Sequence, residues 1–594
     1  MSFPSDSPGI LGDTGLAQFD ALVIGSGAGG SAVAHKLTAA GWKVLVLEAG
    51  INPFPGLDRI DGRGGIPWPI FSNDELKMSI RGFVRQDPLL EPRTFRQTSS
   101  ETARADADVN VLTRNVGGAA VISGVGYPRF TDVDFRMAST LAAANRTFSG
   151  TSFTDWPMTY TQLAPFYTEA EQLCGVAGAA EGSDADPFSS RAGAPFPMPP
   201  QPPMYVGRVL ANGARQLGYA PFNIPSAVNT QPYDQREPCV SCGFCSGYGC
   251  PRNAKGSPAV TTLRKALLSG KCQLRYNAHV TRLVLDGTGR RVTAVEYVDD
   301  EGQTQSATAD RVILAASPIE SARLCLLSDP GGSGVGNSSG HLGRHLMFHY
   351  QTTGVGIFKQ RLHGERGRSV THGISDFRGI LPGGAGLAPA WPLGGILEFG
   401  TSSEPITAAR NSLRPEAVTA AQLLHVSYKQ LLVESPFNAH IAVMIMQGED
   451  APQPSNRVDL DPSVRDVFGQ AVPRVTYKNH DGFELAASAF YKPKMLQILE
   501  AAGAQFGFFS PFDPSVPPQS RHVLGGLRMG TDPSQSVCDA FGKFHDLDNL
   551  YCADGGVFVT SSGYNPTLTI IAIALRTAAA MLSPGAPERT VAGK

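Results

Sequence analysis

A glycine-rich turn near the start of the chain has the residue types and spacing to bind a dinucleotide. Gly25, Gly27 and Gly30 follow a short apolar run at residues 19–24 and precede a stretch typical of a helix, residues 31–40. Glycines in this pattern allow a tight turn, a close approach of pyrophosphate to the backbone, and close packing of helix on strand. The N–H groups and the positive dipole end of that helix would then hold the phosphates.

Glu48 completes the dinucleotide pattern. It ends a second apolar run, residues 43–47, at the distance from the glycines where an acidic side chain accepts a hydrogen bond from a ribose hydroxyl. A reductase that also binds a nicotinamide nucleotide would be expected to show a second such pattern. The other glycine cluster, residues 331–336, follows Pro330 rather than a strand and indicates a loop. One dinucleotide site at the N-terminal end of a long chain favours tightly bound FAD.

Four clustered cysteines are the second candidate for chemistry. They fall within 12 residues, at Cys239, Cys242, Cys245 and Cys250. This spacing is close to the run of thiolate ligands that binds an iron–sulfur cluster in ferredoxins, with one extra residue, and it would also suit zinc. Three interpretations stay open: an iron–sulfur cluster, a zinc ion, and structural cysteines that are reduced or disulfide-linked.

The remaining candidate residues lie in segments far apart in the chain. These segments are Gly117-Gly118, Ala316-Ser317-Pro318, residues 521–530 with His522, residues 549–556 with Asp554 and Gly555, and residues 563–569 with Asn565 and Thr567. In this order, after the glycine turn, they resemble the glucose–methanol–choline (GMC) oxidoreductase family from residue 19 to about residue 582. The cysteine segment is similar to the branch near gluconate and fructose dehydrogenase flavoprotein subunits and pyranose oxidases.

The resemblance implies an FAD-dependent enzyme that oxidises a CH–OH group to a carbonyl on the face of the flavin ring. His522 would take the hydroxyl proton while hydride moves to flavin N5, and Asn565 would hold the substrate oxygen. Both residue types suit these roles. A histidine titrates in the useful range, and an amide stabilises a developing oxyanion without competing for the proton.

The resemblance also implies contacts with FAD. Asp554 and Gly555 would lie along the pyrophosphate and the ribityl chain. The backbone of Val280 would meet the adenine. Asn565 and Thr567 would lie at the start of a helix near the flavin pyrimidine.

The glycine pair Gly117 and Gly118 lies in a run of small residues, which permits the close backbone approach that a flat flavin ring needs. Some members of the family carry the flavin on a histidine six places into this run. That position is Ile122 here, so we expect non-covalent FAD.

Several alternatives for substrate and partner remain open at this point. Pyranoses, glycosides or aldonic acids fit the resemblance best, and a cavity lined by polar side chains would support them. A lipophilic alcohol or sterol would require an apolar tunnel. A lyase or decarboxylase could use the same flavin scaffold, and an electron-transfer subunit would keep the cysteine loop exposed. Electrons would leave to a cytochrome or quinone if the cysteines hold a cluster, and could otherwise pass to O₂.

The elements that must position these residues indicate an α/β fold. A Rossmann-like FAD-binding domain is predicted to be interleaved with an α+β substrate domain built on an antiparallel sheet. A hairpin is expected around Asp286-Gly287, strands at residues 440–447, 457–460 and 473–477 with a turn at Asp461-Pro462, and a helix at 483–502. The predicted boundaries are a leader at 1–17, the FAD-binding domain at 18–150, 226–345 and 520–594, and the substrate-binding domain with lid and linker segments at 151–225 and 346–519.

Three histidines, His341, His345 and His349, recur every four residues. On a helix they would share one face and could bind a metal, but no matching carboxylate motif accompanies them. We therefore expect structural roles for all three.

Composition sets the outer bounds. A chain of 594 residues with 42% hydrophobic and 17% charged residues is long and apolar enough for two domains with a large interior. The net charge of -2 gives no reason to expect nucleic acid as a partner. No apolar run reaches the ~18 residues of a membrane span, and the first residues lack the features of a secretory signal. A cytoplasmic location is the default, and a periplasmic one reached on a partner subunit's signal stays open.

Overall fold

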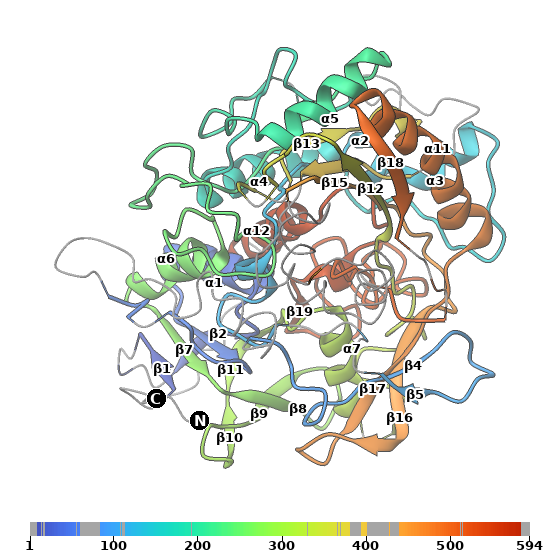
Figure 1. Cartoon of the computed structure of the whole chain (residues 1–594). Helices are drawn as coiled ribbons and strands as arrows, with labels where there is room; N and C mark the ends of the chain where they lie inside the picture. The colour runs from blue at the N-terminus through green and yellow to red at the C-terminus, as the bar shows by residue number, and fades with distance from the viewer. Residues whose placement is uncertain are drawn as a thin grey trace.

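The computed structural model describes most of the chain (Figure 1). The described residues are 9–12, 15, 18–54, 56–59, 84–106, 109, 113–191, 193–329, 331–364, 366–368, 370–379, 394–400, 427, 439–510, 513, 515–518 and 520–583. Within these ranges no helix is both long enough and apolar enough to cross a membrane.

A six-stranded sheet in the order β1-β7-β3-β2-β11-β19 forms the centre of the dinucleotide fold. Its strands are β1 (Ile10–Leu11), β2 (Phe19–Ile24), β3 (Val44–Glu48), β7 (Cys272–Tyr276), β11 (Ala309–Leu314) and β19 (Leu550–Cys552). All pairings are parallel except that of β1 with β7. Every residue of β3 is buried, as expected for a strand covered on both faces. The predicted Rossmann-like unit is confirmed.

Helices cover this sheet and join its strands. The first, α1 (Ala28–Ala39), packs against α12 (Thr567–Leu582) and α6 (Thr262–Leu268), and α12 in turn packs against α4 (Tyr160–Cys174). The helix α7 (Pro318–Leu327) follows β11 and contacts other strands, β8 (His279–Leu285) among them. The sheet, these helices and the residues between them share one large apolar core.

The predicted hairpin around Asp286-Gly287 is present, and the apolar run before it is divided between two sheets. The apolar run at residues 273–285 divides into β7, which joins the parallel sheet, and β8. The break falls at Asn277, whose φ of 54° is a left-handed conformation that asparagine tolerates better than most residues. Beyond it, β8 pairs with β9 (Val292–Val298), and β9 pairs with β10 (Thr304–Ala307).

A second large sheet is wholly antiparallel, as the sequence predicts (Figure 1). Its order is β18 (Ala504–Phe509), β12 (Tyr350–Phe358), β15 (Ile441–Gly448), β14 (Leu397–Gly400), β13 (His372–Ile374) and β6 (Phe222–Asn223). The helices α11 (Ala486–Ala501) and α5 (Tyr205–Gln216) pack together, and α11 contacts three of these strands. This sheet and its helices enclose a separate apolar core.

A four-stranded sheet corrects one prediction. It joins β16 (Arg457–Arg465), β17 (Ala471–Thr476), β4 (Thr94–Arg96) and β5 (Arg104–Ala105). The turn expected at Asp461-Pro462 is wrong, because β16 continues through it with a register shift. The Asp461 carboxylate accepts from the backbone N–H groups of Ser463 and Val464 within the strand. The chain reverses farther on, around Asp466.

The remaining helical segments are short. They are η2 (Ala119–Ile122), α2 (Asp132–Phe135), α3 (Met137–Ala143), η3 (Pro258–Val260), η4 (Asp376–Arg378), η6 (Asp481–Leu485) and η7 (Gly555–Val557).

Candidate active site

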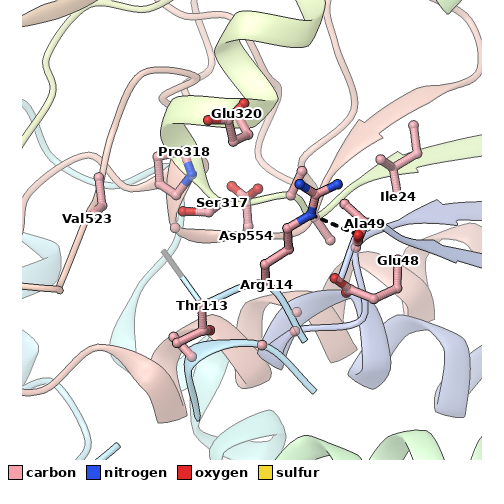
Figure 2. A pocket seen from close by; sticks show the side chains of 18 of the residues that line it. Ile24, Glu48, Ala49, Thr113, Arg114, Ser317, Pro318, Glu320, Val523 and Asp554 are labelled. Atoms are coloured by element: carbon pink, nitrogen blue, oxygen red, sulfur yellow. Dashed lines mark hydrogen bonds between the residues drawn. The ribbon is translucent and has the colours of Figure 1, made fainter. Parts of the chain in front are cut away.

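One cleft collects the segments that the sequence singles out. The ends of β2, β3 and β11, the start of η7 and the start of α12 all line it, together with the 521–523 segment (Figure 2). Ligands of open α/β folds bind outside the carboxyl ends of parallel strands, which is where this cleft lies. Predicted site residues on the cleft are Gly25, Gly27, Glu48, Gly118, Val280, His522, Asp554, Gly555 and Thr567.

The three glycines of the turn are required for different reasons. Gly25 has φ of 101°, and a Cβ there would lie 2.4 Å from the carbonyl oxygen of Ala315. A Cβ at Gly30 would lie 2.0 Å from the carbonyl oxygen of Gly25, so the helix could not approach the strand. A Cβ at Gly27 would meet no protein atom within 4 Å. Open space beside Gly27 is what a pyrophosphate group requires, so this part of the cleft fits a dinucleotide.

Glu48 links the glycine turn at residues 25–30 to the glycine pair Gly117-Gly118. Its carboxylate accepts from the Ser26 N–H (2.9 Å), the Ser26 hydroxyl (2.6 Å) and the Gly50 N–H (2.8 Å). The Ser26 oxygen in turn accepts from the Gly117 N–H at 3.0 Å. Burial raises the pKa of Glu48, and the hydrogen bonds from Ser26 and Gly50 oppose this shift. The predicted contact of Glu48 with a ribose stays a prediction, and its carboxylate also holds the two turns together.

The pair Gly117 and Gly118 forms a turn with φ of 87° and 62°. A Cβ at Gly118 would lie 2.9 Å from the Cα of Gly27, so the two glycine turns are in contact. Gly118 lines the cleft at the start of η2, and the buried Ile122 ends that segment.

Two predicted cofactor residues lie at other points on the cleft wall. Val280, at the start of β8, lines it. Asp554 accepts from the Ser321 hydroxyl (2.6 Å) and from the Gly556 N–H (2.7 Å), which caps η7. Burial raises the pKa of Asp554. Figure 2 shows its carboxyl group beside Ser317 at the wall of the cleft.

His522 is partly exposed at the cleft and pairs with another histidine. Its Nδ1 lies 3.0 Å from Nδ1 of His349, and the two rings are nearly perpendicular, at 86°. Loss of hydration, and to a smaller extent His349, lowers the pKa of His522 to about 3. At neutral pH the imidazole is therefore uncharged and able to accept a proton.

The three regularly spaced histidines do not share one helix face, and the expectation that they are structural stays a prediction. Residues 341–349 form no helix, so these side chains share no helix face. His341 and His345 pair with each other at 2.8 Å, whereas His349 reaches His522.

Asn565 reaches the antiparallel sheet. Its Nδ2 donates to Glu398 on β14 at 2.7 Å, and the other Glu398 oxygen accepts from Gln447 at 3.0 Å. Gln447 also accepts from Gln351 on β12 at 3.0 Å. Burial raises the pKa of Glu398 to about 7. The Asn565 side chain does not cap α12, and its buried Oδ1 accepts no hydrogen bond from the residues that the structure describes.

The cysteine loop, residues 239–250, contacts the end of η2. The Gly247 N–H donates to the Ile122 carbonyl at 2.7 Å, and the buried Lys255 donates to carbonyls of Ser123 (2.8 Å) and Tyr248 (2.9 Å). All four thiols are free, and burial raises the pKa of Cys245 to about 12. Among the residues that the structure describes, no three His, Cys, Asp or Glu side chains gather to hold a metal ion.

Sequence reasoning missed four residues that lie outside the cleft lining but support the predicted site through hydrogen bonds: Ser26, His349, Glu398 and Gln447. Ser26 lies inside the glycine pattern, so a serine able to reach Glu48 was a usable signal. The sequence distinguishes His349 only by its spacing from His341 and His345, which does not indicate a contact with His522. Nothing local distinguishes Glu398 or Gln447, because their importance comes from strands that meet only in the fold.

Comparison with known proteins identifies the family of the chain. Two family models, both described as GMC oxidoreductase, match residues 19–351 and 452–574. The gluconate 2-dehydrogenase flavoprotein of Pantoea cypripedii is 29% identical over 96% of this chain and 94% of its own length. The 2-methyl-1,2-propanediol dehydrogenase of Mycolicibacterium austroafricanum is 28% identical over 95% of both.

A solved structure shares the fold. Pyridoxine 4-oxidase from Mesorbium loti superposes with a TM-score of 0.60 at 16% identity, covering 95% of this chain and 99% of its own. The family and the open cleft at Gly27 both support FAD as the cofactor. The chain belongs to the GMC oxidoreductase family and is an oxidoreductase.

Proposed function

We propose that this enzyme oxidises a CH–OH group of a hydrophilic substrate, such as a sugar, sugar acid or small polyol, to a carbonyl. The observation that carries the proposal is one cleft lined both by the dinucleotide-binding glycine turn and by an uncharged histidine, His522. Its test is reduction of the bound flavin by such alcohols in the absence of oxygen.

FAD would be held without a covalent bond. The predicted residues that line the cleft and would contact FAD are Gly25, Gly27, Glu48, Gly118, Val280, Asp554, Gly555 and Thr567. The other predicted residues, Gly30, Gly117 and Asn565, lie outside the lining and would support these contacts. When bound, FAD supplies the acceptor for the hydride of the alcohol carbon. Ile122, at the position where a linking histidine would stand, has no nucleophilic atom. Acid precipitation of the enzyme should therefore release the flavin into the supernatant.

The chain's own residues would manage the proton and the oxygen. His522 would accept the hydroxyl proton, which favours loss of hydride because negative charge develops on the oxygen. Asn565 uses one Nδ2 proton on Glu398, which leaves its second proton to donate to that oxygen.

The buried amide of Asn565 favours a hydrophilic substrate over a lipophilic alcohol or sterol, because its Oδ1 has no hydrogen-bond partner among the described residues. Buried polar groups that lack partners are costly, and hydroxyl groups of a polyol would satisfy them where a hydrocarbon chain would not. The two named relatives act, by their names, on gluconate and on a diol, which agrees with this preference.

The decisive experiment is anaerobic mixing of the purified enzyme with gluconate, hexoses, small diols and a long-chain alcohol. Bleaching of the flavin band by the hydrophilic compounds is the expected result. Bleaching by the long-chain alcohol alone would favour the lipophilic alternative. Turnover with unchanged absorbance would instead indicate a lyase or decarboxylase.

Reoxidation of the reduced enzyme identifies the electron acceptor. O₂, a quinone and a cytochrome should be compared, alongside iron and acid-labile sulfide analysis of the fresh protein. Iron and sulfide in stoichiometric amounts would assign the Cys239–Cys250 loop to a cluster. Their absence, with bound zinc or without, would decide between the other two interpretations.

A further inference from the structure

We propose that His349 acts as a positioning residue that holds His522 in one tautomer, with the proton on Nδ1 and a free lone pair on Nε2. This inference rests on the proposed function, in which His522 accepts the hydroxyl proton. Which nitrogen of a neutral imidazole carries the proton is set by the partner of the other nitrogen. The partners of both rings are visible in the structure.

The first step concerns His349 itself. Its Nε2 lies 3.2 Å from the carbonyl oxygen of Ser561, which can only accept a hydrogen bond. His349 must therefore carry a proton on Nε2. Burial lowers the pKa of His349 to about 4, so the ring is neutral at pH 7 and its Nδ1 has no proton.

The second step follows from the contact between the rings. With Nδ1 of His349 unprotonated, the 3.0 Å contact needs a proton on Nδ1 of His522. The neutral His522 then has a lone pair at Nε2, on the side of the ring away from His349. The reverse arrangement would place an unprotonated His349 nitrogen against the Ser561 carbonyl, which is two acceptors facing each other.

The third step explains why His349 holds its position. The Asp450 carboxylate accepts hydrogen bonds from the backbone N–H groups of the two residues that flank His349, Phe348 (2.6 Å) and Tyr350 (3.1 Å). The Asp450 N–H also donates to the Ser561 hydroxyl at 2.8 Å, and that hydroxyl donates back to the Asp450 carbonyl at 3.1 Å. A single residue therefore holds both the histidine and the carbonyl that orients it.

A base of this kind has a clear advantage for alcohol oxidation. If His522 could exchange between tautomers, a fraction of the enzyme would present an N–H to the substrate hydroxyl and could not accept its proton. The charged or titratable neighbour that bears on His522 is His349, and Arg378 lowers the pKa of His349 in turn. Both effects keep the pair neutral.

The test uses the holoenzyme and two substitutions that differ in one property. In His349→Asn, the amide oxygen can take the place of Nδ1 and accept from His522. In His349→Leu, no acceptor remains. We expect His349→Leu to lower the rate of flavin reduction at saturating substrate by about 10- to 100-fold with little change in KM, and His349→Asn to recover most of that loss.

A structural readout makes the inference independent of activity. In ¹⁵N-histidine-labelled resting enzyme, the signals of His522, assigned by their loss in His522→Asn, should show protonated Nδ1 and unprotonated Nε2. That pattern should persist in His349→Asn and change in His349→Leu. The control His341→Asn alters the other hydrogen-bonded histidine pair, which lies outside the cleft lining, and should change neither rate nor pattern.

The outcomes separate this inference from the proposed function. A proton on Nε2 of His522 in the unmodified enzyme would overturn the inference even if alcohols reduce the flavin. Equal rates in His349→Leu and the unmodified enzyme would overturn it as well. If no alcohol reduces the flavin but the Nδ1–H pattern is found, the proposed function fails and the tautomer assignment stands.

Discussion

Two predicted catalytic side chains, His522 on the cleft lining and Asn565 next to the lining residue Pro566, reach partners on other elements. His522 is hydrogen-bonded to His349, and Asn565 donates a hydrogen bond to Glu398. Under the proposed function each partner occupies one polar group and leaves another for the substrate, namely Nε2 of His522 and the second Nδ2 proton of Asn565. The chemistry of each residue is therefore set by a neighbour that never needs to touch the substrate.

The low pKa of His522 leads to the first prediction. A general base works only while unprotonated, so activity should be present above the pKa of His522 and be lost as the pH falls through it. That pKa is about 3, well below the ordinary 6.5. We expect kcat/KM for flavin reduction to stay flat from pH 7 to pH 5 and to decline only nearer pH 3, in short pH-jump measurements. A loss of activity as the pH falls through 6.5 would contradict this prediction. In His522→Asn the decline of kcat/KM near pH 3 should be absent.

The contact between Asn565 and Glu398 leads to the second prediction. Glu398→Leu removes the acceptor of two buried amides, Asn565 and Gln447, and should lower the free energy of unfolding by about 1–3 kcal/mol. Glu398→Gln keeps an oxygen for Asn565 while Gln447 can rotate its amide, so its effect should be smaller. Denaturant unfolding of the two apo-proteins measures the difference. Equal free energies of unfolding for the two variants would show that the Asn565–Glu398 hydrogen bond does not stabilise the protein.

At the scale of the element, different glycines of the turn serve folding and cofactor binding. The Cβ contacts show that Gly30 is needed for α1 to pack against β2, whereas Gly27 borders open space. The helix and strand can therefore form even when Gly27, the residue proposed to lie beside the phosphates, is replaced.

This separation is the basis of the third prediction. Gly27→Ala should leave the apo-protein as stable as the unmodified one, because its φ of -67° suits alanine and no atom is in the way, but it should lower flavin content. Gly30→Ala should lower the melting temperature of the apo-protein, since the new Cβ would lie 2.0 Å from a carbonyl oxygen. Thermal unfolding and flavin absorbance measure the two effects. Loss of stability in Gly27→Ala would contradict this assignment.

At the scale of the whole molecule, the cleft is assembled from distant segments. Its wall includes residues near positions 25, 115, 280, 317, 522 and 566, contributed by the parallel sheet, the β8 hairpin strand and the C-terminal helix. The antiparallel sheet is joined to this assembly where the Ile396 N–H donates to the Gly563 carbonyl at 2.9 Å.

A cofactor that touches all these segments should stabilise the whole fold, which is the fourth prediction. A ligand that binds only the folded state at 100 times its Kd contributes about 2.7 kcal/mol. Adding FAD to the apo-protein should therefore raise its melting temperature in a concentration-dependent way, and Gly27→Ala should blunt the rise. Equal melting temperatures with and without FAD, where absorbance shows it bound, would contradict this.

The sequence alone determined the parts of this protein that depend on consecutive residues. The glycine turn, the parallel strands around it, the hairpin and the order of the C-terminal segments could be predicted, because backbone conformation and apolar periodicity are local properties. Only the tertiary structure decided which side chains meet. His349 and His522 are 173 residues apart, and Glu398 and Asn565 are 167 apart. A hydrogen bond between side chains depends on where two strands come to lie, and no local pattern in either segment records that position.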